Sequence, residues 1–117
     1  MNTQRTLQVY AGYSLLMGLA FIFMAGNIIE SMGAVPNDLF IATQQIWGVY
    51  IIGIGAISWF MSDTDNADFF KAMTILTGLI VVVTLYHISA KGLGAPPLYV
   101  NVVVNAAVGG ISFTKMH

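Results

Sequence analysis

The pattern of apolar and polar positions divides the chain into four long apolar runs. These runs cover residues 7–29, 39–61, 70–88 and 98–113. Each run has close to the roughly 20 apolar residues that a helix needs to cross the hydrocarbon of a bilayer. None of them shows the alternation of apolar and polar positions that marks a strand of a membrane barrel. The sequence therefore predicts four membrane-spanning helices and an all-α fold.

Polar and helix-breaking residues separate the four runs. Glu30 and Pro36 follow the first run, and Asp38 precedes the second as a plausible N-cap. The acidic segment 62–66 separates the second run from the third, and the Gly- and Pro-rich segment 92–97 leads into the last run. Because all three connections are short, we expect an integral membrane, antiparallel, up-down-up-down four-helix bundle in which residues 1–117 form a single transmembrane domain.

Composition and charge are typical of a membrane protein and exclude other classes. The chain is 57% apolar and 8% charged, whereas a soluble domain is about 45–50% apolar and about 25% charged. The net charge is −1 and the four basic residues are scattered, so no nucleic-acid partner is expected. Since the chain has no cysteine, a disulfide framework, a thiolate metal site and a thiol nucleophile are all excluded.

The few basic residues predict the orientation in the membrane. Arg5, Lys71 and Lys115 lie on the side of the two termini, and Lys91 alone lies on the other side. Lys and Arg are enriched on the cytoplasmic side, whereas Asp contributes little to the bias. We therefore expect an integral, multi-pass protein of a plasma or inner membrane, with both termini in the cytoplasm.

Small residues recur at helical spacing within each run. Helices in lipid associate through small residues that allow close backbone approach and through polar side chains that bond across the contact. The positions expected to serve helix packing are Ser14, Gly18, Gly48, Gly55, Gly78 and Gly109. Packing within the chain is the simplest interpretation of these positions, and contact with another protein is the alternative.

Polar side chains gather in one half of the expected bundle. If the helices are antiparallel, the half next to the first and third connections contains Asn27, Glu30, Gln44, Gln45, Tyr86, His87, Asn101 and Asn105. Unpaired polar groups are costly in hydrocarbon, so this polar cluster indicates a hydrogen-bonded network or a pocket that contacts a ligand or partner. The alternative is that several of these side chains reach interfacial water and that the asparagines only join helices.

His87 is the residue that raises the question of metal or haem binding, because imidazole is a common ligand of both. Glu30 and Asp38 are expected at the same membrane surface, but the sequence has no His-x3-His or Glu-x-x-His spacing. Acid–base chemistry by His87 and Glu30 would need a substrate position that the sequence does not indicate. We therefore predict no catalytic residue, no metal site and no cofactor. A lipid, quinone or pigment is compatible with the cluster, whereas haem or a metal ion at His87 is disfavoured.

Three short motifs carry a resemblance to known families from about residue 37 onward. They are Gln45-Ile46-Trp47-Gly48-Val49-Tyr50, Leu85-Tyr86-His87-Ile88 and Gly94-Ala95-Pro96-Pro97. In their order along the chain they resemble small four-helix membrane proteins of the DoxX-like and uncharacterised bacterial families and, more distantly, the ergosterol-pathway scaffold family. The resemblance implies a non-catalytic membrane helper, often beside an enzyme. The chain departs from the commonest bacterial pattern because His87 stands where arginine is expected.

These observations predict a non-catalytic accessory or scaffold subunit of a larger membrane protein complex. The expected partners are other integral membrane subunits and lipids, and the chain itself is not expected to be an enzyme, although an enzyme complex could contain it. The alternative is a binder of a lipid, quinone, pigment or other amphipathic small molecule in the polar-lined leaflet. A small transporter is a third and weaker interpretation, because the first run has no acidic residue before Glu30.

Overall fold

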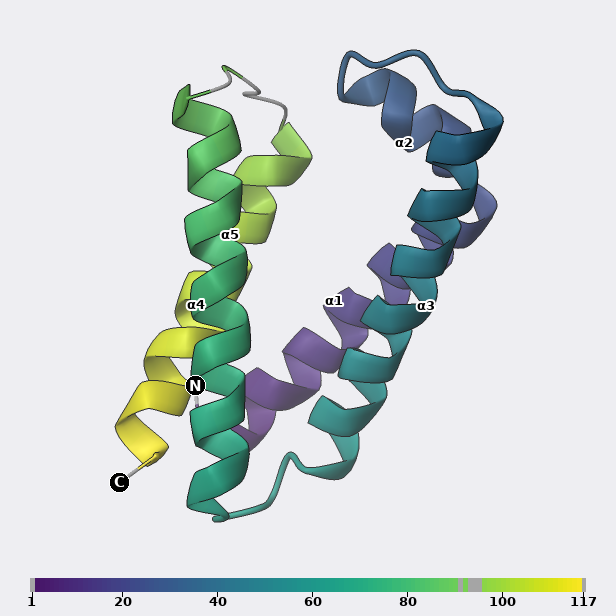
Figure 1. Ribbon diagram of the computed structural model, residues 1–117. Coiled ribbons are helices and arrows are strands. Elements are labelled where there is room, and N and C mark those ends of the chain that lie inside the picture. Colours follow the sequence, from purple (N-terminus) through teal and green to yellow (C-terminus); the bar gives the residue numbers. More distant parts are fainter. Residues whose placement is uncertain (1, 91, 93–95, 117) are drawn as a thin grey trace. The chain divides into compact units, whose positions relative to one another are not determined.

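The computed structural model describes residues 2–90, 92 and 96–116, and the described chain is helical (Figure 1). The helices are α1 (Thr3–Phe23), α2 (Ala25–Ser31), α3 (Asp38–Phe60), α4 (Ala67–Ala90) and α5 (Pro96–Lys115). No strand occurs among the described residues, and the predicted all-α fold class is confirmed. Lys91, Gly94 and Ala95, which entered the orientation and resemblance arguments, lie outside the described residues.

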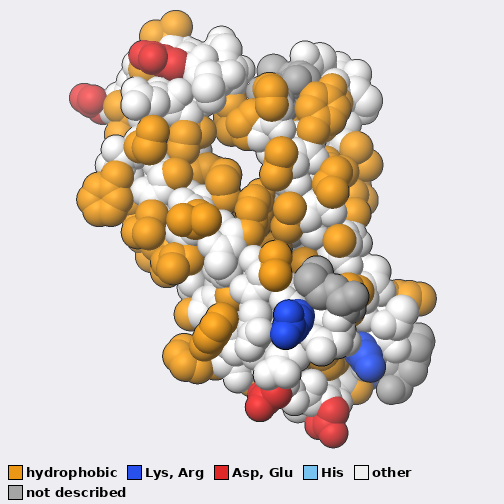
Figure 2. Space-filling model, turned by 180° about the vertical axis from the view of Figure 1, so that it is seen from behind, with side chains coloured by type: hydrophobic (Ala, Val, Ile, Leu, Met, Phe, Trp, Pro, Cys, Tyr) orange, Lys and Arg blue, Asp and Glu red, His pale blue; other side chains and the backbone are white. Residues whose placement is uncertain are grey.

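Four of these helices are long and apolar enough to cross a membrane. α1, α3, α4 and α5 contain 21, 23, 24 and 20 residues. At about 1.5 Å per residue, each approaches or exceeds the roughly 30 Å of a hydrocarbon core. Figure 2 shows hydrophobic side chains over much of the visible face of the helices. By length and composition, the four helices are therefore compatible with the predicted multi-pass membrane protein.

The first apolar run forms two helices, in place of the single helix expected over residues 7–29. α1 begins at Thr3 because Asn2 caps it, the Asn2 side chain accepting a hydrogen bond from the Arg5 N–H at 2.8 Å. α1 ends at Phe23, and Met24 leaves the helical conformation with φ −125° and ψ 30° before α2 begins. Hydropathy does not register this break because the residues on both sides of it are apolar.

The starts of the later helices follow from their capping residues. Asn37, and not the expected Asp38, is the N-cap of α3, since its side chain accepts a hydrogen bond from the Phe40 N–H at 2.9 Å. Asp38 is the first helical residue, where its negative charge interacts favourably with the helix dipole. Pro96 opens α5, as expected, because the first helical position needs no N–H donor.

The helices form two compact units, Met1–Ser62 and Asp63–His117. In the first unit, here called the first hairpin, α1 packs against α3, and the short α2 contacts both. In the second unit, the second hairpin, α4 packs against α5. The packing of all four long helices into a single bundle stays a prediction.

Candidate functional site

Two glycines bring the backbones of α1 and α3 into direct contact in the first hairpin. A Cβ atom placed on Gly18 would lie 2.7 Å from the Gly48 carbonyl oxygen, and one placed on Gly48 would lie 2.7 Å from the Gly18 carbonyl oxygen. A backbone carbonyl therefore blocks each position, and the Ile52 side chain also lies against Gly18, so any side chain at either position would push the helices apart. Close backbone approach of this kind favours the association of helices in lipid.

A second contact lies two helical turns farther along α3. A Cβ atom on Gly55 would lie 3.0 Å from the Ser14 Cβ atom and 3.1 Å from the Ala11 carbonyl oxygen. Ser14 is buried, as are Gly48 and Gly55 on α3. The four packing residues predicted in this part of the chain thus all lie in the contact between α1 and α3.

Gln45 joins the two helices by a hydrogen bond. Its side-chain Nε2 donates to the Ile22 carbonyl oxygen at 3.0 Å. Ile22 lies in the last turn of α1, where carbonyl oxygens lack partners within the helix. Gln45 therefore caps the end of α1 from the neighbouring helix. This partner was not predicted, because the break after Phe23 that exposes the carbonyl was not predicted either.

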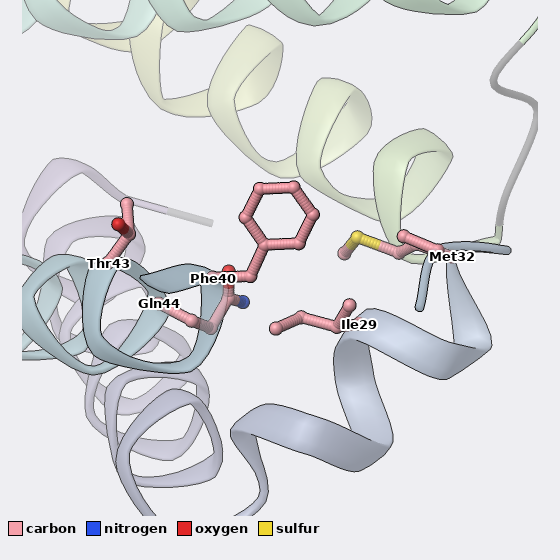
Figure 3. Close-up of a pocket in the computed structure, with 6 residues that line it drawn as sticks. Ile29, Met32, Phe40, Thr43 and Gln44 are labelled. Atoms are coloured by element: carbon pink, nitrogen blue, oxygen red, sulfur yellow. The ribbon is translucent and has the colours of Figure 1, made fainter. Parts of the chain in front are cut away.

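A shallow cavity of about 210 Å³ lies between α2 and the first turns of α3. It is lined by Ile29, Met32, Ala34, Phe40, Thr43 and Gln44. Figure 3 shows the side chains of Ile29, Met32 and Phe40 projecting toward the same space, with Gln44 beside them. Gln44 is the one member of the predicted polar cluster that lines the cavity. Asn27 and Glu30 are exposed on α2 and do not line it.

Two asparagines join the helices of the second hairpin. The Asn101 Nδ2 donates to the Thr84 hydroxyl oxygen on α4 at 3.3 Å. One turn farther along α5, the Asn105 Nδ2 donates to the carbonyl oxygen and the side-chain Oδ1 of Asn101, at 2.8 and 2.9 Å. Asn105 is only 2% exposed. The two amides thus form a short chain of hydrogen bonds that runs from α5 to α4.

A second contact in this hairpin lies at Gly109, where the side chain of Thr77 occupies the space beside the glycine. A Cβ atom on Gly109 would lie 2.6 Å from the Thr77 Oγ1. Thr77 is completely buried, and its hydroxyl donates to the Met73 carbonyl oxygen at 2.7 Å. Gly78, in contrast, is exposed, with no described atom within 4 Å of a Cβ placed on it. Of the two packing glycines predicted here, only Gly109 therefore lies in the contact between α4 and α5.

Tyr86 and His87 form an aromatic pair near the end of α4. Their rings meet edge to face, with centroids 5.4 Å apart and planes at 75°. Tyr86 is exposed and His87 is half-buried. In the part of the chain that the structure describes, no group of three or more His, Cys, Asp or Glu residues is arranged to hold a metal ion.

The predicted polar cluster is divided between the two hairpins. The first hairpin contains Asn27, Glu30, Gln44 and Gln45, and the second contains Tyr86, His87, Asn101 and Asn105. Within each hairpin some members have definite partners, namely Ile22 for Gln45 and Thr84 for Asn101. Convergence of all eight side chains on one pocket stays a prediction.

The sequence did not indicate most of the cavity, because most of its lining side chains are apolar and look like ordinary residues of a spanning helix. Ile29 was placed inside a continuous first helix, whereas it lies on the separate α2. The signal that could have revealed this site is Gly26, together with Glu30 and Pro36, which make a short helix and a turn at this end of the run plausible.

Comparison of the chain with models of protein families, with curated proteins and with solved structures gave no match. Its function therefore has to be inferred from its own residues and contacts.

Proposed function

We propose that the protein is a multi-pass membrane protein whose four long helices cross the bilayer as an antiparallel bundle, and that it acts as a non-catalytic accessory or scaffold subunit of a larger membrane protein complex. The observation that carries this proposal is an exposed aromatic pair, Trp47 and Tyr50, on α3.

The position of the pair along α3 is unusual for these residue types. α3 runs from Asp38 to Phe60, so Trp47 and Tyr50 flank its midpoint and lie within about 3 Å of it along the helix axis. Trp and Tyr usually lie at the membrane surface, because their N–H and O–H groups need polar partners. At the middle of a spanning helix, lipid provides no such partner.

Within the first hairpin, the pair is exposed and open to a neighbouring helix. Trp47 is 58% exposed and Tyr50 is 64% exposed, and their ring centroids lie 6.0 Å apart. No hydrogen bond of either side chain is present among the described residues. A helix of another subunit, bearing an acceptor such as a carbonyl or a hydroxyl oxygen, would satisfy both groups and bury the rings. Aromatic residues of this kind are enriched at the centres of protein interfaces.

The distribution of small and bulky residues supports the same function. Within each hairpin, small residues such as Gly48 and Gly109 lie in the contact between the helices, whereas many large apolar side chains are exposed. Exposed examples are Leu16, Phe23, Val82, Val83 and Val103. Lipid tails and the helices of a neighbouring subunit can both pack against such surfaces. The exposed faces would therefore allow a scaffold subunit to bind its partners.

Co-purification from native membranes in a mild detergent tests the proposal. A tagged wild-type chain is expected to retain specific membrane proteins, and the Trp47→Leu/Tyr50→Leu variant is expected to lose them while its own thermal unfolding midpoint stays close to that of the wild type. Val49→Leu, at an exposed position of the same helix, is the control. Full retention of the partners by the double variant, or a wild-type chain that purifies alone, would contradict the proposal.

The membrane topology can be tested separately, because the chain has no native cysteine. Single cysteines are introduced at Val35, in the connection between α2 and α3, and at Asp65, in the connection between α3 and α4. Both positions are exposed. With cytoplasmic termini, an impermeant thiol reagent added outside intact cells should label position 35 and miss position 65. Labelling of both positions would overturn the spanning of α3, and the reverse pattern would overturn the orientation.

A further inference from the structure

The cavity of the first hairpin is shallow, mostly apolar and open on one side. Ile29 is 7% exposed and forms a buried wall, whereas Phe40 is 47% exposed and leaves one side open. Its volume of about 210 Å³ is below the roughly 300–1,000 Å³ of pockets that enclose a whole ligand. The cavity therefore suits the head and first carbons of a longer molecule, with the rest of that molecule lying outside.

Gln44 provides the polar contact in this apolar cavity. Its two polar neighbours are already satisfied, since Thr43 donates to the Leu39 carbonyl oxygen at 2.8 Å and Gln45 donates to Ile22. The Gln44 amide has no hydrogen bond among the described residues. Gln44 is the seventh residue of α3, about 9 Å along the helix from its start, so its amide lies below the membrane surface if α3 spans the bilayer. An occupant with a hydroxyl or carbonyl oxygen would pair it.

The charges around the cavity select against anionic ligands. Glu30 precedes the cavity on α2, and Asp38 starts α3. No lysine, arginine or histidine occurs anywhere between residues 6 and 70. A phosphate or carboxylate head group usually requires such a partner, and neither the cavity lining nor residues 6–70 provide one.

From these three observations we propose that the cavity binds an uncharged lipid with a small head, placing a hydroxyl or carbonyl oxygen at the Gln44 amide and the start of a hydrocarbon chain against Ile29, Met32 and Phe40. Glycerolipids such as diacylglycerol and isoprenoid alcohols share this chemistry. The inference does not depend on the proposed partner complex, because it concerns only residues of the first hairpin.

Quenching of Trp47 fluorescence measures this binding in the purified full-length chain. Trp47 lies three residues after Gln44 and four after Thr43, on the same side of α3. With the second tryptophan removed by Trp59→Phe, the protein is titrated in detergent micelles with brominated diacylglycerol or brominated phosphatidylglycerol. We expect saturable quenching by the neutral lipid only. Displacement of the brominated diacylglycerol by unlabelled diacylglycerol or by an unlabelled isoprenoid alcohol then shows which of these two lipids the cavity binds more tightly.

Three variants decide whether the cavity is the site. Gln44→Leu removes the hydrogen bond and is expected to weaken binding about tenfold. Ala34→Phe, in the exposed connection after α2, fills the cavity and is expected to abolish saturation. Asn27→Leu removes an exposed amide from α2 outside the cavity and should bind as the parent does. Quenching that rises linearly for both lipids, stronger saturable quenching by the anionic lipid, or saturation unchanged in Ala34→Phe would each overturn the proposal.

Discussion

The two hairpins hold their helices together by different means. In the first hairpin, Gly18 and Gly48 place backbone against backbone, and the cross-helix hydrogen bond of Gln45 lies at one end of the contact. In the second hairpin, the side chain of Thr77 stands between the helices beside Gly109, and Asn101 bonds across to α4.

This difference determines what each contact tolerates. A backbone carbonyl cannot move aside without shifting a helix, so the first contact should be sensitive to added volume above all. A threonine side chain can change rotamer, so the second contact should tolerate a small addition and depend more on its hydrogen bonds. Both contacts satisfy the requirements of helix association in lipid, where no hydrophobic force drives helices together.

The largest effect is expected for Gly48→Leu. The new side chain would begin 2.7 Å from the Gly18 carbonyl oxygen, and overpacking of this kind costs about 1–3 kcal/mol and occasionally more. We expect the upper end of this range because the obstacle is backbone. Unfolding in detergent, followed by circular dichroism against increasing denaturant, provides the measurement.

Gly53→Leu is the matched control for this change, since it lies on the same helix and no described atom is within 4 Å of its Cβ position. Equal destabilisation by the two leucines would mean that glycine matters on α3 for a reason other than the contact with α1.

A smaller effect is expected for Gly109→Ala in the second hairpin. The added methyl group would lie 2.6 Å from the Thr77 Oγ1, so Thr77 must rotate away from the Met73 carbonyl oxygen or α5 must shift. We expect a loss of about 1 kcal/mol, most of which Thr77→Ala should restore in the double variant. Gly110→Ala is the control, since no described atom lies near its Cβ position. If the losses from the two substitutions simply add, Gly109 and Thr77 do not interact in the way described.

The sequence was sufficient to predict the four long helices, because each corresponds to a long apolar run bounded by polar or helix-breaking residues. It also placed Gly18, Gly48 and Gly55 on packing faces, since residues at helical spacing share one side. Hydropathy could not locate the break at Met24, whose neighbours are all apolar. Neighbouring positions were equally hard to separate: Asn37 and Asp38 are both good caps, and only the backbone conformation selects Asn37.

Adjacent residues on a helix point in different directions, which explains why neighbouring positions have different surroundings in the structure. Gly78 was expected to serve helix packing, yet it is exposed, whereas its neighbour Thr77 is buried. Gln44 and Gln45 are chemically identical in sequence, but one lines a cavity and the other caps α1. A turn of about 100° per residue separates such neighbours, and the direction of the partner helix, which sequence does not specify, decides their roles.

The polar character of the second contact can be tested with Asn101→Leu/Asn105→Leu. The double variant removes the hydrogen bond from Asn101 to Thr84 and the side-chain hydrogen bonds from Asn105 to Asn101. Hydrogen bonds between membrane helices are worth about 0.6 kcal/mol each on average, and a buried leucine at position 105 adds strain. We therefore expect a loss of about 1 kcal/mol, measured as above, with Val103→Leu at an exposed position of α5 as the control. A double variant as stable as the wild type would show that the asparagines do not hold the hairpin together.

The smallest effect, and the sharpest contrast, is expected between two neighbouring glutamines of the first hairpin. Gln45→Leu leaves the Ile22 carbonyl oxygen without its partner on α3, so a loss near the average of about 0.6 kcal/mol is expected. Gln44→Leu removes an amide that has no hydrogen bond among the described residues and replaces it with an apolar group in an apolar cavity. In detergent free of neutral lipid, where no ligand stabilises the wild type, Gln44→Leu should therefore leave stability unchanged or raise it slightly. The two unfolding midpoints must then move apart, and a shared downward shift would mean that Gln44 has a structural role like that of Gln45.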